Sequence, residues 1–306
     1  MIAAAPLAPI VLATSRGRFH ALAAGDPRAP IVLVLHGFPD APPTFGPFLA
    51  AVAARGYRAI APWLRGYAPS VMTGPYDPDT LADDLAAWLA ALSPHGPAFV
   101  VGHDWGAIAT YAACARTPTQ IAAAVTLAVP HPLAFLHHAD PAQLARSWYM
   151  LFFQLPGAPR AARVADFALI DHLWQRWSPA YNLPPELRAA IHDCLAASWP
   201  APTLYYRALI RPFGRARARL RHDSPLRRPL TVPTLYLHGA DDGCIGVDVG
   251  RGAERHFAGP YQHDVLADTG HFLAAERPDD VAARAHAWFQ RHARSRADGT
   301  DGSPRA

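Results

Sequence analysis

The feature that most constrains this chain is an alternation between short apolar runs and longer segments with helical periodicity. The apolar runs are Ile31–Leu35, Tyr57–Ala61 and Phe99–Val101, and the helical patterns are Phe45–Arg55, Leu81–Leu92 and Ala107–Arg116. Runs that are apolar throughout are typical of strands buried on both faces, and parallel strands need helical crossovers between them. The alternation therefore predicts an α/β fold, a mostly parallel sheet with helices on both faces.

A long interruption divides this alternation into two parts. The remaining expected elements are a hairpin at Ile10–Thr14 and Phe19–Ala24, strands at Ala122–Ala128, Thr234–Leu237 and Gln262–Leu266, and a last helix at Arg277–His292. Between the strand at Ala122–Ala128 and the strand at Thr234–Leu237, the chain is mostly helical and rich in aromatic residues. The sequence thus predicts a core of residues 1–132 and 228–306 with an inserted helical cap of residues 133–227. Sites in open α/β sheets lie at the carboxyl ends of the strands, and a cap inserted there would cover the site.

Composition limits the possible partners. With 306 residues, 51% hydrophobic residues and a net charge of +4, the chain can bury a large core, and overall disorder is excluded. The arginine-rich composition is not accompanied by a nucleic-acid-binding motif, and the apolar stretches are too interrupted to span a bilayer, so neither nucleic acid nor a membrane is expected as a partner. The three cysteines are far apart, which argues against a disulfide framework and predicts a cytoplasmic location.

The most specific motif is Gly102-His103-Asp104-Trp105-Gly106, between an expected strand and an expected helix. Small residues two positions before and two after a central residue allow the sharp turn of a nucleophile elbow, which usually carries serine. Here Asp104 holds the central position, and a carboxylate there can attack carbon and form an ester. The alternative is that Asp104 only caps the following helix.

A second glycine-containing turn, His36-Gly37-Phe38-Pro39-Asp40, follows an earlier strand. Gly37 allows close approach of the backbone, so the amide of Phe38 can point into the site beside the amide of Trp105. Two such donors would form an oxyanion hole. Taken alone, this segment is more typical of an ordinary Gly-Pro turn.

An acid and a histidine follow in the chain order expected for an elbow nucleophile. Asp242 comes after the strand at Thr234–Leu237, and His271 comes after the last expected strand. We assign Asp242 as the acid that orients the base and His271 as the base. Asp241 and Asp268 are alternative acids.

Taken together, these motifs resemble the α/β-hydrolase fold epoxide hydrolases, which are related to the haloalkane dehalogenases. The matching stretches are HGFPD, RAIAPWLRGYAPS, GHDWG, GADD and GHF, and they cover nearly the whole expected core. Trp63 departs from the acidic residue common at its position. The resemblance implies a soluble hydrolase that needs no metal and no organic cofactor.

Two cap segments extend the resemblance. The segment SWYMLFFQLPG is similar to the epoxide hydrolase segment that carries a ring-opening tyrosine and places it at Tyr149, and LYYR places a second at Tyr206. Tyr205 is the alternative if the second match is shifted by one residue. The other possibility is that these tyrosines only pack within an aromatic cap.

The resemblance implies that Asp104 opens an apolar epoxide, with Tyr149 and Tyr206 holding the ring oxygen, and that water activated by His271 hydrolyses the resulting ester to a vicinal diol. Phe38, Trp105 and Phe153 are the expected substrate-binding residues. A haloalkane or haloacid dehalogenase with the same nucleophile, with Trp105 as one halide donor, is the alternative. A non-catalytic ligand-binding module of the same fold is a further alternative. The chain is expected to act as a monomer or homodimer, with an epoxide and water as its partners.

Overall fold

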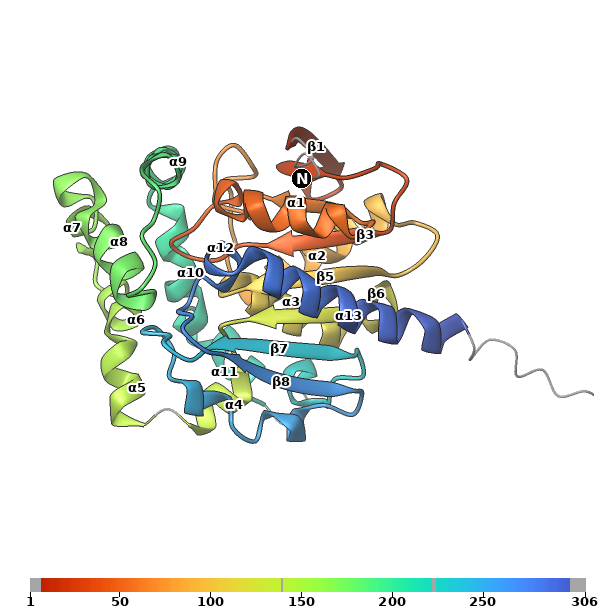
Figure 1. The fold of residues 1–306 in the computed structure, drawn as a ribbon. Coiled ribbons are helices and arrows are strands. Elements are labelled where there is room, and N and C mark those ends of the chain that lie inside the picture. Colours follow the sequence, from red (N-terminus) through yellow and green to blue (C-terminus); the bar gives the residue numbers. More distant parts are fainter. Residues whose placement is uncertain (1–6, 139, 222–223, 298–306) are drawn as a thin grey trace, which may run out of the picture.

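The computed structural model describes residues 7–138, 140–221 and 224–297, and an eight-stranded sheet lies at its centre (Figure 1). The strand order is β1-β2-β4-β3-β5-β6-β7-β8. The first two strands form the expected hairpin, β2 also pairs antiparallel with β4, and all other pairs are parallel. The strands are β1 (Ala8–Thr14), β2 (Gly17–Ala24), β3 (Ile31–Leu35), β4 (Arg58–Pro62), β5 (Ala98–His103), β6 (Ile121–Leu127), β7 (Thr234–Gly239) and β8 (Tyr261–Leu266).

Helices cover both faces of the sheet, as predicted. The five residues of β3 are all buried, and they alternate between the two faces. Val32 and Val34 pack into the core beneath α1 (Gly46–Ala54) and α13 (Pro278–Ala297), while Leu33 and Leu35 pack into the core on the side of α2 (Pro78–Leu92) and α3 (Trp105–Arg116). This two-sided burial explains why the strand is apolar throughout rather than alternating.

The predicted helical insertion follows β6. Its helices are α4 (Pro132–His137), α5 (Pro141–Arg146), α6 (Trp148–Phe152), α7 (Ala158–Ala161), α8 (Val164–Trp177), α9 (Pro185–Ser198), α10 (Ala201–Ile210) and α11 (Phe213–Arg219). Helices α5 to α10 stand at one end of the sheet, where the parallel strands have their carboxyl ends (Figure 1). The remaining short elements are α12 (Leu273–Glu276), η1 (Pro42–Phe45), η2 (Pro118–Gln120), η3 (Pro225–Arg227), η4 (Val247–Gly250) and η5 (Ala253–His256).

Element ends differ from the sequence prediction by a few residues, and local chemistry explains the differences. Helix α2 begins three residues before the predicted start because the Asp77 side chain accepts a hydrogen bond from the amide of Thr80 at 3.0 Å, which caps the helix. Pro78 then occupies its first turn, where a missing amide hydrogen costs nothing. The helix predicted at Phe45–Arg55 is α1, and the 3-10 turn η1, which ends at Phe45, precedes it.

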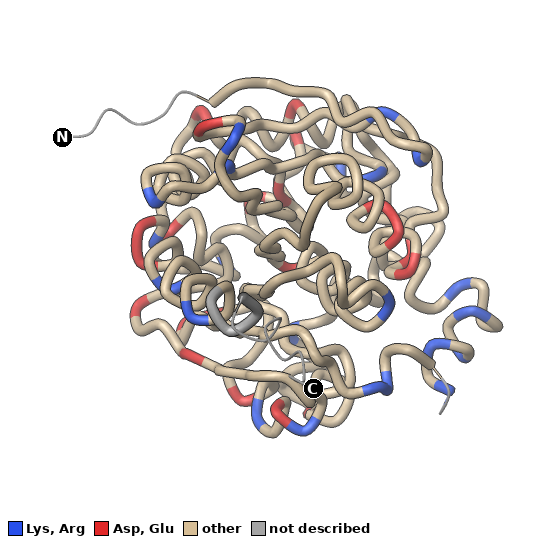
Figure 2. The backbone as a smooth tube through the Cα atoms, turned by 90° about the vertical axis from the view of Figure 1, so that its right-hand side faces the viewer, with Lys and Arg blue, Asp and Glu red and all other residues tan. Residues whose placement is uncertain are grey.

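Acidic and basic positions are interspersed around the backbone (Figure 2). The segment around α11 contains several arginines, but two of them are partly neutralised. Arg215 and Arg219 lie 3.2 and 3.5 Å from the carboxylate of Asp77 at the start of α2. Within the described ranges, no helix is both long enough and apolar enough to cross a membrane.

One buried ion pair ties α2 to the loop after β4. The Asp84 side chain is 0% exposed and accepts two hydrogen bonds from the guanidinium of Arg65, each 2.7 Å long. Arg16, from the turn of the first hairpin, donates a third at 2.6 Å. Such a pair stabilises the fold because each charge compensates the other. Either charge left alone in the core would lower the free energy of unfolding.

We therefore expect Asp84→Asn to lower the free energy of unfolding by about 3–5 kcal/mol, since it leaves the buried Arg65 cation without an anionic partner. The neighbouring Asp83→Asn is the matched control: Asp83 is 41% exposed and pairs with Arg116 on the surface. We expect this control to cost less than about 1 kcal/mol. Urea unfolding of the three proteins measures both values, and equal losses in the two variants would contradict this account.

Candidate active site

The turn at Asp104 presents its side chain between β5 and α3. Asp104 has φ 50° and ψ −114°, a conformation that costs a non-glycine residue roughly 1–3 kcal/mol. The flanking glycines are required sterically. A Cβ atom at Gly102 would lie 2.3 Å from the carbonyl oxygen of Gly106, and one at Gly106 would lie 2.3 Å from that of Leu35. The Asp104 side chain makes no capping hydrogen bond to α3, so the helix-cap interpretation is wrong.

Both Asp104 carboxylate oxygens face groups from other strand ends. Oδ1 accepts a hydrogen bond of 2.8 Å from the amide of Phe38. This contact needs glycine at position 37, because a Cβ on Gly37 would lie 2.3 Å from the same oxygen. Oδ2 lies 3.7 Å from Nε2 of His271. Trp105 is the first residue of α3, where an amide has no acceptor within the helix, so its N–H is available beside that of Phe38.

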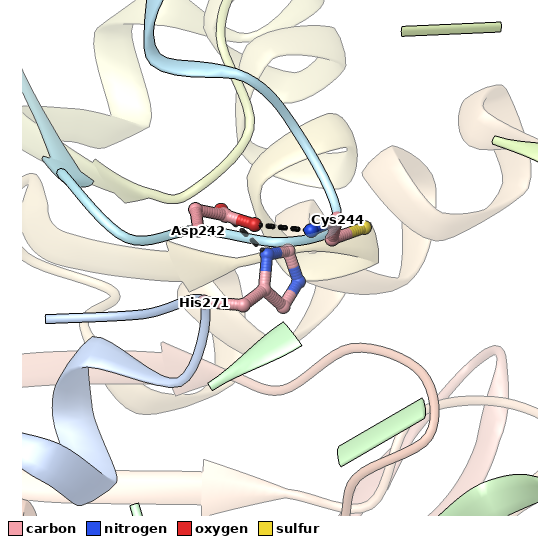
Figure 3. A group of neighbouring side chains, drawn as sticks. All are labelled: Asp242, Cys244 and His271. Carbon is pink, nitrogen blue, oxygen red and sulfur yellow. Dashed lines mark hydrogen bonds and ion pairs between the residues drawn. The ribbon is translucent and has the colours of Figure 1, made fainter. Parts of the chain in front are cut away.

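Asp242 and His271 are directly hydrogen-bonded. Nδ1 of His271 lies 2.8 Å from Oδ2 of Asp242, and Figure 3 shows the imidazole directed at this carboxylate. The other oxygen, Oδ1, accepts hydrogen bonds from the amides of Cys244 at 2.7 Å and Ile245 at 2.9 Å, which fix the carboxylate in the loop after β7. The alternative acids Asp241 and Asp268 have exposed side chains.

The charges of these groups depend on one another. Burial by itself would lower the pKa of His271, but the carboxylates of Asp242 and Asp104 outweigh burial and raise the pKa to about 10. Burial would raise the pKa of Asp242, but the interaction with His271 holds it below the usual value. The neighbouring His103 is neutral near pH 7 because burial lowers its pKa to about 3. The resting site is therefore an imidazolium held between two carboxylates.

Tyr149 of α6 and Tyr206 of α10 lie over this group, with their ring centroids 5.4 Å apart. The hydroxyl of Tyr149 lies 3.3 Å from Sγ of Cys244. The hydroxyl of Tyr206 is buried among the side chains of Trp105 and Tyr149 and makes no hydrogen bond of standard geometry with the described residues. A buried hydroxyl without a well-formed hydrogen bond can donate one to a bound molecule. Burial raises the pKa of both tyrosines well above the usual value, so both carry their proton.

The structure distinguishes Tyr206 from its neighbour Tyr205. The Tyr205 hydroxyl donates a hydrogen bond to the carbonyl oxygen of Arg65, and its ring stacks on Tyr76. Tyr205 is therefore committed to the contact between cap and core. Adjacent positions on a helix point in different directions, so only one of the two tyrosines faces Asp104.

The expected substrate-binding residues form a buried aromatic wall around the carboxylate. The ring of Phe38 lies 5.4 Å from that of Phe153 and 5.3 Å from that of Tyr206. Trp105 contacts Tyr206 at 5.2 Å. The side chain of Asp104 is only 8% exposed, so these rings exclude water from the carboxylate.

Several residues of the site belong to no motif that predicts their position in it. The carbonyl oxygen of Trp177, at the end of α8, accepts hydrogen bonds from the amides of His271 at 3.0 Å and Gly243 at 3.1 Å. Asp40, quoted above within a motif but given no role, is buried near the site, and burial raises its pKa to about 7. Cys244 lies only two residues after Asp242, so a search of the acid loop itself would have found it.

The structure offers one cluster that could be considered for a metal ion. Among the described residues, ligand atoms of Asp242, Cys244 and His271 lie within 4.8 Å of one another. Both Asp242 oxygens and Nδ1 of His271 are already hydrogen-bonded, and the Cys244 thiol points away from the carboxylate (Figure 3). Burial raises the pKa of Cys244 well above the usual value, which disfavours the thiolate that a metal needs. These residues fit a hydrogen-bonded acid–histidine pair better than a metal site.

Comparison with known proteins agrees with this geometry. Residues 30–278 match the family model described as alpha/beta hydrolase fold. Epoxide hydrolase 3 of Siraitia grosvenorii is 30% identical over 90% of this chain and 96% of its own length, and Epoxide hydrolase 4 of Homo sapiens is 27% identical over 86% and 73%. The crystal structure of Epoxide Hydrolase A from Mycobacterium thermoresistibile superposes with a TM-score of 0.77 at 25% identity, covering 93% of this chain and 98% of that one. The chain therefore belongs to the α/β-hydrolase fold family and, within it, to the epoxide hydrolases.

Proposed function

We propose that the protein opens an apolar epoxide to a vicinal diol through a covalent ester on Asp104. The observation that carries this proposal is the position of two protonated phenols from separate cap helices, Tyr149 and Tyr206, above a buried carboxylate. An epoxide oxygen becomes a strongly basic alkoxide as the ring opens, and it needs proton donors at that moment. The names of the relatives support the same substrate class.

In the first half-reaction, an Asp104 oxygen attacks an epoxide carbon from the side opposite the breaking C–O bond. The C–O electron pair moves onto the ring oxygen, and a tyrosine hydroxyl donates its proton to that oxygen. The product is a hydroxyalkyl ester of Asp104 and a tyrosinate. The aromatic wall of Phe38, Trp105 and Phe153 holds the apolar part of the substrate and keeps bulk water away.

In the second half-reaction, His271 removes a proton from water, and the resulting hydroxide attacks the ester carbonyl of Asp104. The amides of Phe38 and Trp105 stabilise the tetrahedral oxyanion, each contributing about 3 kcal/mol. Collapse of this intermediate breaks the C–O bond to the substrate and expels the diol as its alkoxide, which takes the proton that His271 removed from water. The proton released when the carboxyl group of Asp104 ionises again returns His271 to the imidazolium of the resting site.

The ester itself activates the base. In the resting site, two carboxylates hold a proton on His271, whose pKa is raised to about 10. Forming the ester removes the charge of Asp104, so the pKa of His271 falls. His271 then gives its proton to the tyrosinate left by ring opening, and the neutral imidazole can accept a proton from water. Asp242 remains to orient the ring and to stabilise the imidazolium that forms.

We also propose the division of the chain into a core of residues 1–132 and 228–306 and a cap of residues 133–227 that supplies both tyrosines. The three cysteines are all unpaired, which supports a reducing, cytoplasmic location. We propose that the enzyme works as a monomer or homodimer and that its chemistry requires no metal and no organic cofactor, since Asp104, His271 and the tyrosines supply every group that the two half-reactions use.

A dehalogenase would use Asp104 in the same way but would need hydrogen-bond donors to a halide. Trp105 is one candidate donor. Two cap tryptophans, however, use their indole N–H groups elsewhere: Trp174 donates to the carbonyl oxygen of Pro39 and Trp199 to that of Pro159. A purely ligand-binding module would have no use for a strained, buried carboxylate beside a histidine. Both observations favour epoxide hydrolysis.

We expect His271→Gln to form the ester and fail to hydrolyse it, because the base acts only in the second half-reaction. Intact-mass measurement after mixing with an apolar epoxide should show the enzyme plus one substrate. His263→Gln is the control, since His263 lies on β8 and packs on Tyr236 away from the nucleophile. That variant should turn over without accumulating the adduct. A folded, inactive and unmodified His271→Gln enzyme would argue against the assignment.

We expect Tyr149→Phe and Tyr206→Phe each to slow ester formation from epoxides, and the double variant to be nearly inactive, because each change removes one proton donor and keeps the ring. Tyr205→Phe is the matched control and should form the ester at close to the wild-type rate. Single-turnover mixing measures the alkylation rate, and parallel assays measure diol release from an epoxide and halide release from a haloalkane. Ester formation by the double variant at the wild-type rate, or release of halide in place of diol, would favour the dehalogenase interpretation.

A further inference from the structure

We propose that helix α5 of the cap positions the catalytic acid, with Gln143 and Arg146 as positioning residues that hold the loop from Asp242 to Gly246. This inference rests on the proposed function, because it concerns the acid of that reaction. Both side chains bind main-chain groups of the loop.

Gln143 binds the loop as a neighbouring strand would. Its side chain is buried, and its amide nitrogen donates to the carbonyl oxygen of Cys244 at 3.0 Å. Its amide oxygen accepts from the amide of Gly246 at 2.8 Å. The same nitrogen also donates to Oγ of Ser147 at 3.0 Å. A side-chain amide thus satisfies two main-chain groups on either side of Ile245, in a loop with no regular secondary structure to satisfy them.

Arg146 holds the other end of the loop. Its guanidinium donates a hydrogen bond of 2.6 Å to the carbonyl oxygen of Asp242. Gln143 and Arg146 are three residues apart and therefore lie on the same face of α5. The main chain of Gln143 is itself fixed, since its amide donates to the capping carboxylate of Asp140 at 2.7 Å. One short helix thus holds both ends of the acid loop.

The loop passes this restraint to the reacting groups. The amide of Cys244, whose carbonyl group Gln143 binds, donates to the same Asp242 carboxylate that orients His271. Sγ of Cys244 lies beside the hydroxyl of Tyr149 on α6, the helix that follows α5. Displacing the loop would therefore loosen the contact between Asp242 and His271. The loss should fall on ester hydrolysis, because attack by Asp104 does not require the acid.

The test uses single-turnover kinetics with an apolar epoxide on Gln143→Met and Arg146→Met, which keep side-chain length and remove the hydrogen bonds. We expect ester hydrolysis to slow about 10- to 100-fold and ester formation to change less than about threefold. The pH profile of hydrolysis should reach its plateau at lower pH than in the wild type, because a weaker contact with Asp242 lowers the pKa of His271. Arg146→Lys, which keeps a donor, should recover part of the hydrolysis rate.

The matched controls are Gln290→Met on α13 and Arg163→Met in the cap, which change exposed residues away from the loop. Arg146 borders an open cleft of about 580 Å³, so its truncation leaves no buried cavity. If Gln143→Met fails to fold, the two Arg146 variants therefore carry the test. Unchanged hydrolysis in Arg146→Met, or equal slowing of both half-reactions, would overturn the proposal.

A measurement without substrate separates this proposal from the proposed function. The proton shared by His271 and Asp242 should give a far-downfield proton NMR resonance in the wild type and in both controls. We expect the resonance to shift or broaden in Arg146→Met and to remain in Arg146→Lys. If the wild type forms no ester with epoxides but the resonance responds in this way, the proposed function fails and the positioning role stands. An unaffected resonance in an enzyme that hydrolyses epoxides would refute the positioning role alone.

Discussion

An imidazolium held between two buried carboxylates is the interaction on which the rest of the site depends. Burying any one of these charges alone would cost several kcal/mol, and each is stabilised only through its partners. His271 lies 2.8 Å from Asp242 and 3.7 Å from Asp104, at the ends of three different strands. The parallel sheet brings these strand ends together, and the strained turn between Gly102 and Gly106 places Asp104, the proposed nucleophile, beside His271. The same arrangement couples the charges of the two residues, because neutralising Asp104 would lower the pKa of His271.

The cap does more than cover this group. Tyr149 and Tyr206, the proposed proton donors, lie beside a buried carboxylate, and the carbonyl oxygen of Trp177 accepts hydrogen bonds from the amides of Gly243 and His271. Helix α5 adds a second attachment through Gln143 and Arg146. Cap and core therefore meet through directed hydrogen bonds to the catalytic loops as well as through apolar packing. Under the proposed mechanism, a substitution in the cap would alter proton transfer at His271 in the core.

Much of the fold could be predicted from the sequence because its signals are local. The strand at Ile31–Leu35 is apolar throughout because it is buried on both faces, and the glycines around Asp104 mark a turn that other residues cannot make. The choice between Tyr205 and Tyr206 could not be made in this way, since it depends on a distant carbonyl group, that of Arg65. Gln143 could not be recognised in the sequence, because a single glutamine forms no motif. Its partners are main-chain groups of Cys244 and Gly246, which only the fold brings close to it.

The central claim is that Asp104 becomes covalently attached to the substrate. A single turnover in water enriched in heavy oxygen, with enzyme in excess over an apolar epoxide, tests it most directly. The ester mechanism predicts that the diol from this first turnover is unlabelled, because its new oxygen comes from the carboxylate. The label should then appear in the Asp104 side chain, detectable by mass spectrometry of the peptide that contains it. A labelled diol and an unlabelled Asp104 would mean that water attacks the epoxide directly, and would contradict the account.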